Sequence, residues 1–349
     1  MRVVQVVKRF GLCGGMEEYA YRLTCELSKL GVKVHVVCEE KVSEPEVGTI
    51  EIVQLGKSLR KPRWLSHIIF AKKVGNWAMM NTGKDTIIHS HERINCHHVT
   101  TIHATLYNFS QKHKFPSLRN YLNEYIENRE LSSPRVQKIV PVSALISGQI
   151  TAKYSGVSHK LVSAIPPGVY QLNGIKNEFE PESPVIGFMG KEWKRKGLPK
   201  VIEIWRELRI EYPSARLCLA GFPVEESIGI LENELKFVDI LGHVSRKEDF
   251  YEKIDILLHP AQREAYGMVI AEALSMSIPV MCSKETGASD LLNSEHILSC
   301  KDGIGLWCEV LKEILLQPPC DCLSQNKFKS WSDVAGDYYS CYRELTHAN

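Results

Sequence analysis

The stretch Asp255–Glu272, DILLHPAQREAYGMVIAE, determines how this chain is organised. Its apolar residues 256–258 have the length of a buried strand, which Pro260 ends because proline cannot donate a hydrogen bond into a sheet ladder. Apolar residues at 268, 269, 271 and 274 then predict a helix over 268–276. A strand, a short loop and a helix in this order are typical of an α/β fold.

The loop and helix start of this stretch carry the groups of a binding site. Open α/β sheets bind ligands outside the carboxyl ends of their strands. The backbone amides of Tyr266, Gly267 and Met268 would point out of the helix N-terminus, where anions are favoured. Glu264 on the loop and Glu272 in the helix are acceptors suited to sugar hydroxyl groups. These groups together predict a site for a ligand with phosphates and two sugars, a nucleotide sugar.

On spacing alone, Glu264 and Glu272 could equally be a loop carboxylate that caps the helix and a solvated helix carboxylate. A metal site is less expected, because no DxD pair or histidine at ligand spacing accompanies them. The whole stretch, however, resembles the E-x7-E motif of retaining glycosyltransferases of family four, with H-P before it and E-A-L after it. The resemblance implies that Glu272 holds the ribose and that Glu264 orients the donor sugar.

A second strand–loop–helix unit lies upstream, where the apolar residues 184–190 precede KEWKRKG and a helix from Leu198. Four bases within residues 191–197 predict an anion clamp, although a solvated basic loop has the same composition. In the family this loop supplies two diphosphate ligands, and the matching positions are Lys191 and Lys196. Lysine at the first position, where arginine is common, keeps the charge but loses the bidentate geometry of arginine.

The N-terminal residues predict a further unit of the same kind: a strand over 3–7, a helix over 17–30 and a strand over 32–38. Gly14 and Gly15 precede the helix, a place for a phosphate or a closely approaching sugar, although a plain tight turn is the simpler alternative. No G-x-G-x-x-G is present, so this is not a dinucleotide-binding fingerprint. The G-G-x-E opening also resembles the N-terminal loop of the family.

Three histidines, His89, His91 and His103, stand near the ends of two predicted strands. A lone histidine at such a place is more often structural, but three on one edge of a sheet indicate that one faces a ligand. His103 occupies the place of the family's T-x-H segment at the acceptor side of the cleft. The resemblance therefore implies that His103 lies under the reacting centre, with His91 as the alternative.

Composition and length bound the remaining possibilities. A chain of 349 residues calls for two domains, and its 44% hydrophobic and 24% charged residues are typical of a soluble globular protein. No apolar run is long enough for a bilayer, and the N-terminus is charged too early for a secretory signal. Eleven cysteines without a C-x-x-C pair argue against both a disulfide framework and a zinc site, so we expect a reducing cytoplasm.

A breaker-rich PPGVY at 166–170 and a polar linker over 171–184 separate two series of alternating strands and helices. We expect an N-terminal acceptor-binding domain over 1–170, a nucleotide-sugar-binding domain over 171–330, and a helix over 331–349 that packs back on the first domain. Two doubly wound Rossmann-like sheets would then face one cleft, which the resemblance identifies as the GT-B fold. The stripe expected on the final helix is Val334, Tyr338, Cys341 and Leu345.

Charge is distributed unevenly, with a balance of +10 over residues 1–170 and −8 over residues 171–349. No nucleic-acid-binding signature accompanies the basic half, so an anionic membrane or a phosphorylated lipid acceptor is the better expectation. The segment 57–80, KSLRKPRWLSHIIFAKKVGNWAMM, mixes bases with apolar residues and predicts either a membrane-surface helix or an ordinary amphipathic surface helix. The membrane hypothesis uses Arg60, Lys61, Arg63, Trp64, Ile68, Ile69, Phe70, Lys72 and Lys73.

The resemblance is strong over 184–290 and loose over 1–170, and it implies transfer of a hexosyl group from a nucleotide sugar with retention of configuration. No metal or other cofactor would be required, because Lys196 and its loop stabilise the leaving diphosphate. The motifs look most like those of lipopolysaccharide core α-glucosyltransferases, so UDP-glucose, a glycan or lipid-linked acceptor, and a cytoplasmic protein on the inner membrane face are expected. Two alternatives remain: a nucleotide-sugar 2-epimerase of related fold, and a non-catalytic partner of another glycosyltransferase.

Overall fold

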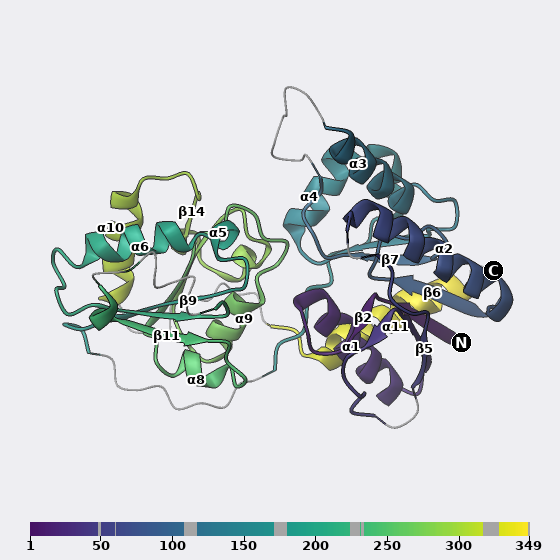
Figure 1. The fold of residues 1–349 in the computed structure, drawn as a ribbon, viewed down its shortest axis with the longest axis horizontal. Helices are drawn as coiled ribbons and strands as arrows, with labels where there is room; N and C mark the ends of the chain where they lie inside the picture. Colours follow the sequence, from purple (N-terminus) through teal and green to yellow (C-terminus); the bar gives the residue numbers. More distant parts are fainter. Residues whose placement is uncertain are drawn as a thin grey trace. The chain divides into compact units, whose positions relative to one another are not determined.

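The computed structural model describes residues 1–47, 50–59, 61–107, 117–170, 180–223, 231, 234–316 and 328–347. The chain forms two compact units (Figure 1). Unit 1 comprises residues 1–168 together with 329–349, and unit 2 comprises residues 169–328. Residues 171–179 of the predicted linker and Arg60 of the basic segment lie outside the described residues.

Unit 1 is built on a six-stranded parallel sheet in the order β5-β3-β1-β6-β7-β8. The chain builds this sheet outward from β1 in one direction and from β6 in the other, so the direction reverses between these two neighbours. The strands are β1 (Arg2–Val6), β3 (Lys33–Cys38), β5 (Glu51–Gln54), β6 (Thr86–Ser90), β7 (Val99–Ile102) and β8 (Lys138–Pro141), with a separate pair β2 (Arg9–Phe10) and β4 (Glu40–Lys41). The helices are α1 (Gly15–Lys29), α2 (Arg63–Asn81), α3 (Leu118–Leu131), α4 (Ala144–Lys153), the 3-10 helix η1 (Ser155–Lys160) and α11 (Trp331–His347).

Unit 2 repeats this plan with the parallel order β11-β10-β9-β12-β13-β14, and its direction reverses between β9 and β12. The strands are β9 (Val185–Met189), β10 (Arg216–Ala220), β11 (Val238–Gly242), β12 (Ile256–His259), β13 (Val280–Ser283) and β14 (Ile297–Leu298). The helices are α5 (Trp193–Lys196), α6 (Leu198–Leu208), α8 (Glu248–Tyr251), α9 (Met268–Ser275) and α10 (Ile304–Leu315), with 3-10 helices η2 (Leu235–Phe237), η3 (Gly287–Leu291) and η4 (Ser294–His296). The predicted α/β class with two doubly wound sheets is therefore confirmed.

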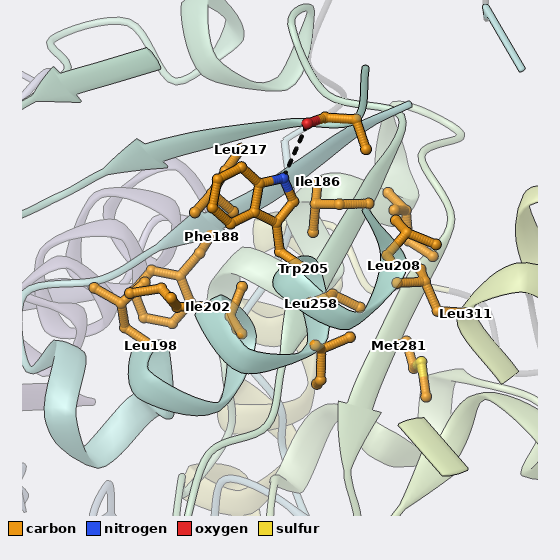
Figure 2. Packing of buried hydrophobic residues seen from close by; sticks show 14 of the residues in the cluster. Ile186, Phe188, Leu198, Ile202, Trp205, Leu208, Leu217, Leu258, Met281 and Leu311 are labelled. Carbon is orange, nitrogen blue, oxygen red and sulfur yellow. Dashed lines mark hydrogen bonds between the residues drawn. The ribbon is translucent and has the colours of Figure 1, made fainter. Parts of the chain in front are cut away.

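The core of unit 2 is formed between the sheet and the helices α6 and α10. Trp205 of α6 is fully buried among aliphatic side chains such as Leu217 and Leu258, as Figure 2 shows. Its indole N–H donates to the carbonyl of Ala215 at 3.1 Å, so the polar atom of this large side chain does not remain unpaired in the core. The loop between α6 and β10 is thereby fixed to the helix that precedes it.

The final helix, α11, packs against α1 and belongs to unit 1. One of its four predicted stripe residues is wrong: Cys341 is only half-buried, whereas Tyr342 is fully buried, because the buried face follows steps of four and three residues through 334, 338, 342 and 345. The chain leaves unit 1 at Gly168 and re-enters beside it. A Cβ at Gly168 would lie 2.6 Å from the backbone nitrogen of Trp331, so only glycine permits this close approach.

Helix α2 contains most of the segment considered for membrane contact, but it packs against the core of unit 1. Phe70 has no exposed surface and lies in a cluster with Val4, Val6 and Ile88, so its proposed insertion among acyl chains is wrong. Lys61, Arg63 and Lys72 are exposed, whereas Lys73 donates to the carbonyls of Leu55 and Gly56 at 3.2 and 2.9 Å. None of the helices in the described part of the chain has both the length and the apolar character needed to cross a bilayer.

Candidate functional site

The reversal of strand order between β9 and β12 places two predicted loops at the ligand-binding edge of unit 2. The carboxylate of Glu264 lies between two bases of the 191–197 loop. Its Oε2 is 3.3 Å from Lys196 Nζ and 3.2 Å from Arg195 Nη1. The structure thus brings together two residues predicted separately, Glu264 and Lys196, from positions 68 apart in the sequence.

The electrostatic environment of Glu264 keeps it ionised. Burial raises the pKa of this carboxyl group, but the charges of Lys196 and Arg195 and the hydrogen bond from Lys196 lower it, and the net pKa is below the ordinary value. A half-buried carboxylate with two cationic partners can orient a ligand through hydrogen bonds and stay unprotonated near neutral pH. This is the behaviour expected of a residue that binds sugar hydroxyl groups.

Two glycines explain why the basic loop lies against β12. At Gly190 a Cβ would be 2.4 Å from Cδ of Lys196, so the lysine stem crosses the end of β9 where a larger residue would obstruct it. Gly197 has a φ of +92° and ends α5, and a Cβ there would be 2.3 Å from the carbonyl oxygen of Pro260. The loop backbone is fixed further by Gln262 N–H, which donates to the carbonyl of Arg195 at 2.9 Å.

Arg195 is a site residue that the sequence analysis did not single out. It donates to the carbonyl of Arg263 and to Glu192 as well as to Glu264, and therefore joins the two loops directly. The motif comparison favoured only the first and last bases of the loop, and Lys191 is exposed at the end of β9. Spacing gave no means of telling which of four neighbouring bases would turn toward Glu264.

Glu272 has a different set of partners from Glu264. It is 5% exposed on α9, and its two carboxylate oxygens bind Lys247 Nζ at 2.5 Å and the Tyr251 hydroxyl group at 2.8 Å. Burial, and then the charge of Glu272, raise the pKa of Tyr251 well above its ordinary value, so this phenol remains a donor. Two donors therefore fix the orientation of the Glu272 carboxylate, whose remaining lone pairs are the ones that could accept from ribose hydroxyl groups.

The N-terminus of α9 has the conformation expected of an anion-binding helix start. Gly267 has a φ of +103°, and a Cβ there would be 2.9 Å from the Thr286 side chain, so glycine is required. No side chain among the described residues caps this helix, and the preceding loop is held by hydrogen bonds from Ala288 N–H to the Tyr266 carbonyl and from Gly287 N–H to the Glu264 carbonyl. The Met268 amide at the helix start remains a predicted phosphate ligand.

His259 is a second residue of this region that the sequence analysis did not single out, although its H-P motif was noted. It ends β12 and is fully buried, and neither ring nitrogen has a hydrogen-bond partner among the described side chains and backbone. Burial and the neighbouring charge of Lys196 lower its pKa to about 3, against the opposing effect of Glu264. His259 is therefore neutral beneath the ion pair of Lys196 and Glu264.

In unit 1, the predicted glycine-rich turn does open α1. Gly14 is the residue before the helix and Gly15 is its first residue. A Cβ at Gly14 would be 2.4 Å from Oε2 of Glu17, so this carboxylate already lies over the helix N-terminus. The negative charge there disfavours the phosphate that was considered for the predicted site at Gly14 and Gly15.

The two candidate histidines of unit 1 form one hydrogen-bonded pair. His91 Nδ1 lies 2.8 Å from His103 Nε2, and His91 is 4% exposed while His103 is half-buried. Burial lowers the pKa of His103 to about 3, so this histidine is neutral at physiological pH. His103 is the more accessible of the two, and His91 lies behind it.

Glu92 is a further candidate at the β1–β6 reversal of unit 1. Its Oε1 accepts from the backbone N–H of Lys8 at 3.2 Å, and Oε2 is 3.7 Å from His67 Nδ1. Burial raises its pKa to about 7, although Lys8 lowers it. Glu92 is only 6% exposed, so its carboxyl group is almost fully removed from solvent. Among the described residues, no group of three His, Cys, Asp or Glu side chains is close enough to hold a metal ion.

We predict that acid destabilises the protein through its buried histidines. Burial lowers the pKa values of His89, His91 and His103 well below the 6.5 expected in the unfolded chain, so below pH 6.5 the unfolded chain binds more protons than the native protein. The contribution of these histidines to the free energy of unfolding is fully present above pH 6.5. It is lost as the pH falls below 6.5, by up to about 1.4 kcal/mol per histidine and pH unit.

Urea unfolding at pH 7.5 and pH 5.5 measures this effect. His91→Asn should make the dependence on pH shallower, whereas His159→Asn, at an exposed position, should leave it unchanged. The same unfolding free energy at both pH values in the parent protein would contradict the prediction.

Comparison with known proteins agrees with this geometry. The model of Glycosyltransferase Family 4 matches residues 13–170, and that of Glycosyl transferases group 1 matches residues 173–313. The chain is 30% identical over 118 residues to the capsular polysaccharide biosynthesis glycosyltransferase CapM of Staphylococcus aureus, covering 32% of this chain and 31% of CapM. It is 24% identical over 200 residues to the lipopolysaccharide glucosyltransferase WaaG of Escherichia coli K12, covering 50% of this chain and 52% of WaaG. These matches thus span just under a third of the length of CapM and about half of the length of WaaG.

Two crystal structures show the same fold over nearly the whole chain. WaaG, a glycosyltransferase involved in lipopolysaccharide biosynthesis, has a TM-score of 0.76 at 15% identity, covering 97% of this chain and 95% of WaaG. Anabaena HepE in complex with UDP and glucose has a TM-score of 0.69 at 13% identity, covering 97% of this chain and 98% of HepE. The chain belongs to the family-four glycosyltransferases and has their GT-B fold.

Proposed function

We propose that this glycosyltransferase moves a hexosyl group from a nucleotide sugar to a glycan or lipid-linked acceptor, with retention of configuration. Unit 2 would bind the donor and unit 1 the acceptor. The observation that carries the proposal is the contact of Glu264 with Lys196 and Arg195 at the strand reversal of unit 2. UDP-glucose is the favoured donor, because HepE binds UDP and glucose and WaaG is a lipopolysaccharide glucosyltransferase.

The charges of unit 2 supply a mechanism for departure of the nucleoside diphosphate. Glu264 neutralises Lys196 and Arg195, which lie 3.3 and 3.2 Å from its carboxylate. A diphosphate at the end of β9 would attract both bases, leaving the carboxylate to accept from hydroxyl groups of the transferred sugar. Negative charge grows on the diphosphate as the glycosidic bond breaks, so cations already held in place stabilise the transition state more than the ground state.

This cationic loop would also replace a metal ion. Lys191, Arg195 and Lys196 lie within six residues at the end of β9, and the N-terminus of α9 adds backbone amides. Fixed positive groups at a diphosphate do the electrostatic work that Mg²⁺ or Mn²⁺ does in other transferases. We therefore propose that neither a metal nor another cofactor is needed besides the nucleotide-sugar donor.

The function is tested by transfer from UDP-glucose, UDP-galactose, UDP-N-acetylglucosamine and GDP-mannose in EDTA, with NMR of the anomeric proton of the product. We expect a donor-dependent product of retained configuration, with full activity in EDTA. Activity only after addition of Mg²⁺ or Mn²⁺ would refute the metal-free site. Conversion of the donor alone into a sugar isomer would identify an epimerase instead, and absence of any donor binding in thermal-shift measurements would indicate a non-catalytic protein.

Substitution of Lys196 should reduce turnover more than donor binding. Lys196→Met removes the positive charge that would stabilise the leaving diphosphate. We therefore expect kcat to fall by about 10²-fold, as for loss of one preorganised donor to a developing anion. Lys194→Met is the matched control, because Lys194 lies in the same loop but is exposed and lies over the Trp193 ring at 4.9 Å. If kcat is retained in Lys196→Met and only KM for the donor rises, Lys196 is a ground-state binding residue.

We also propose that the protein works at the inner face of a membrane, held by charge. The structure leaves Lys61, Arg63 and Lys72 exposed on or beside α2, and each base near an anionic surface contributes about 1 kcal/mol. Such binding is reversible and weakens with salt, because the Debye length shortens.

Vesicle co-sedimentation tests this attachment. Binding to anionic vesicles at low salt should be reduced by Lys61→Glu with Lys72→Glu, and retained by Lys33→Glu with Lys84→Glu, which places the same charge changes at or beside the starts of strands β3 and β6. Equal binding of the parent protein to neutral and anionic vesicles would exclude the electrostatic attachment.

A further inference from the structure

A continuous chain of hydrogen bonds runs through the core of unit 1 from His103 to the backbone at Ile165. It begins with the His103–His91 contact of 2.8 Å and continues from His91 Nε2 to Gln5 Oε1, also at 2.8 Å. The Gln5 amide then meets the Tyr342 hydroxyl group at 3.3 Å. The remaining contacts are Tyr342–His89 at 2.6 Å, His89–Thr101 at 2.8 Å, Thr101–Tyr338 at 2.6 Å, Tyr338–Tyr19 at 3.1 Å and Tyr19 to the carbonyl of Ile165 at 3.0 Å.

The last member sets the direction of the whole chain. The Tyr19 hydroxyl group lies within hydrogen-bonding distance of both the Ile165 carbonyl and the Tyr338 hydroxyl group but has only one proton. Because a backbone carbonyl can only accept, both contacts are satisfied only when Tyr19 donates to Ile165 and accepts from Tyr338. Each hydroxyl group has one proton and each neutral imidazole has one N–H. Tyr338 therefore accepts from Thr101, and Thr101 accepts from Nε2–H of His89.

The same reasoning continues to the other end. Nδ1 of His89 is then an acceptor for the Tyr342 proton, and the oxygen of Tyr342 accepts from the Gln5 amide N–H. The Gln5 carbonyl accepts from Nε2–H of His91, and Nδ1 of His91 accepts from Nε2–H of His103. His103 is left with its proton on Nε2 and a lone pair on Nδ1.

The opposite direction leaves two oxygens facing each other. Reversal of all the donors would turn the Tyr19 proton toward Tyr338, and the Tyr19 oxygen would then lie 3.0 Å from the Ile165 carbonyl with no proton between them. Tyr19 is only 2% exposed, and two acceptors buried against each other without a proton between them are unfavourable. One tautomer of His103 is therefore favoured by a group at the far end of the chain.

We propose that Gln5, His91 and Tyr342 are positioning residues that hold His103 as the Nε2–H tautomer, so that its Nδ1 lone pair is presented to a hydroxyl group of the substrate. The side chain of His103 is half-buried, and its Nδ1 has no hydrogen bond among the described residues. The ring of Tyr19 meets the His103 ring edge-on at a centroid distance of 4.8 Å, which limits rotation of the imidazole. The kinetic part of this proposal rests on the transferase function proposed above.

The chain also gives α11 a role beyond packing. Its Tyr338 and Tyr342 take part in four of the eight hydrogen-bonded contacts, and both are fully buried. A helix made only to close the core could carry phenylalanine at these positions, because the hydroxyl groups add nothing to apolar burial. The returning C-terminal segment is thus part of the apparatus that orients His103.

The test is the tautomer of His103, measured by two-bond ¹H–¹⁵N NMR of the full-length protein with ¹⁵N-labelled histidine. His103→Gln assigns the signals by removing them. We expect the Nε2–H form in the parent protein and a mixture of tautomers in Tyr342→Phe, because loss of the hydroxyl group lets the Gln5 amide turn over. Tyr21→Phe is the matched control: Tyr21 is 1% exposed, and its hydroxyl group donates to the Glu44 carbonyl at 2.7 Å, away from the chain.

A second pair of variants tests the link next to the histidines. Gln5→Glu still accepts from His91 and should retain the Nε2–H tautomer, whereas Gln5→Leu should lose it. In transfer assays kcat should fall at least about fivefold in Gln5→Leu and Tyr342→Phe with donor KM within about twofold, since a misplaced imidazole proton affects the reacting complex more than donor binding. Gln5→Glu and Tyr21→Phe should keep most of kcat.

The outcomes separate this proposal from the function itself. An Nδ1–H tautomer in the parent protein, or the same spectrum for Tyr342→Phe and Tyr21→Phe, would overturn the chain. A changed tautomer with unchanged kcat would overturn the positioning role. If the tautomer behaves as expected but no donor supports transfer, the chain stands and the proposed hexosyl transfer fails.

Discussion

Both sheets are parallel throughout, and this constraint determines where the chemistry of the protein can lie. Parallel strands need connections that cross a face of the sheet, so the loops after the strands gather at one edge. Where the strand order reverses, two such loops diverge and leave room for a ligand. In unit 2 those loops carry the bases of 191–197 and Glu264, and in unit 1 they carry Lys8 and Glu92.

At the unit 2 edge, the arrangement balances burial against charge. Glu264 is partly removed from water, which alone would favour its protonated form, yet Lys196 and Arg195 keep it ionised. The bases in turn are stabilised by an anion, which Glu264 provides. A side chain at Gly197 would meet the Pro260 carbonyl and separate the two loops, and one at Gly190 would displace the Lys196 side chain, so both glycines preserve this geometry.

In the core of unit 1, by contrast, the buried histidine, tyrosine, glutamine and threonine side chains are neutral and are joined by a continuous series of hydrogen bonds. Histidines 89, 91 and 103 cannot gain a proton without losing stability, since burial disfavours the charged form and each ring already has hydrogen-bond partners. A buried hydrogen-bond network of this kind destabilises the fold if one of its polar groups lacks a partner. When every group is paired, the network favours one arrangement of the core. Two members of this network, Tyr338 and Tyr342, come from α11. The orientation of His103 therefore depends on the return of the polypeptide to unit 1 as α11.

The sequence by itself determined the alternation of strands and helices, the two units, and the placement of Glu264, Glu272, Lys191 and Lys196 on strand–loop–helix segments, because periodicity and breaker residues act within a few positions. Only the tertiary structure decided which polar groups meet: Arg195 with Glu264, Lys247 and Tyr251 with Glu272, and Gln5 with Tyr342 from positions 337 apart. It also turned Phe70 into the core and placed Tyr342 where Cys341 was expected. Local patterns record how much of a segment is apolar, whereas the partner of a buried polar atom depends on distant backbone that no local pattern describes.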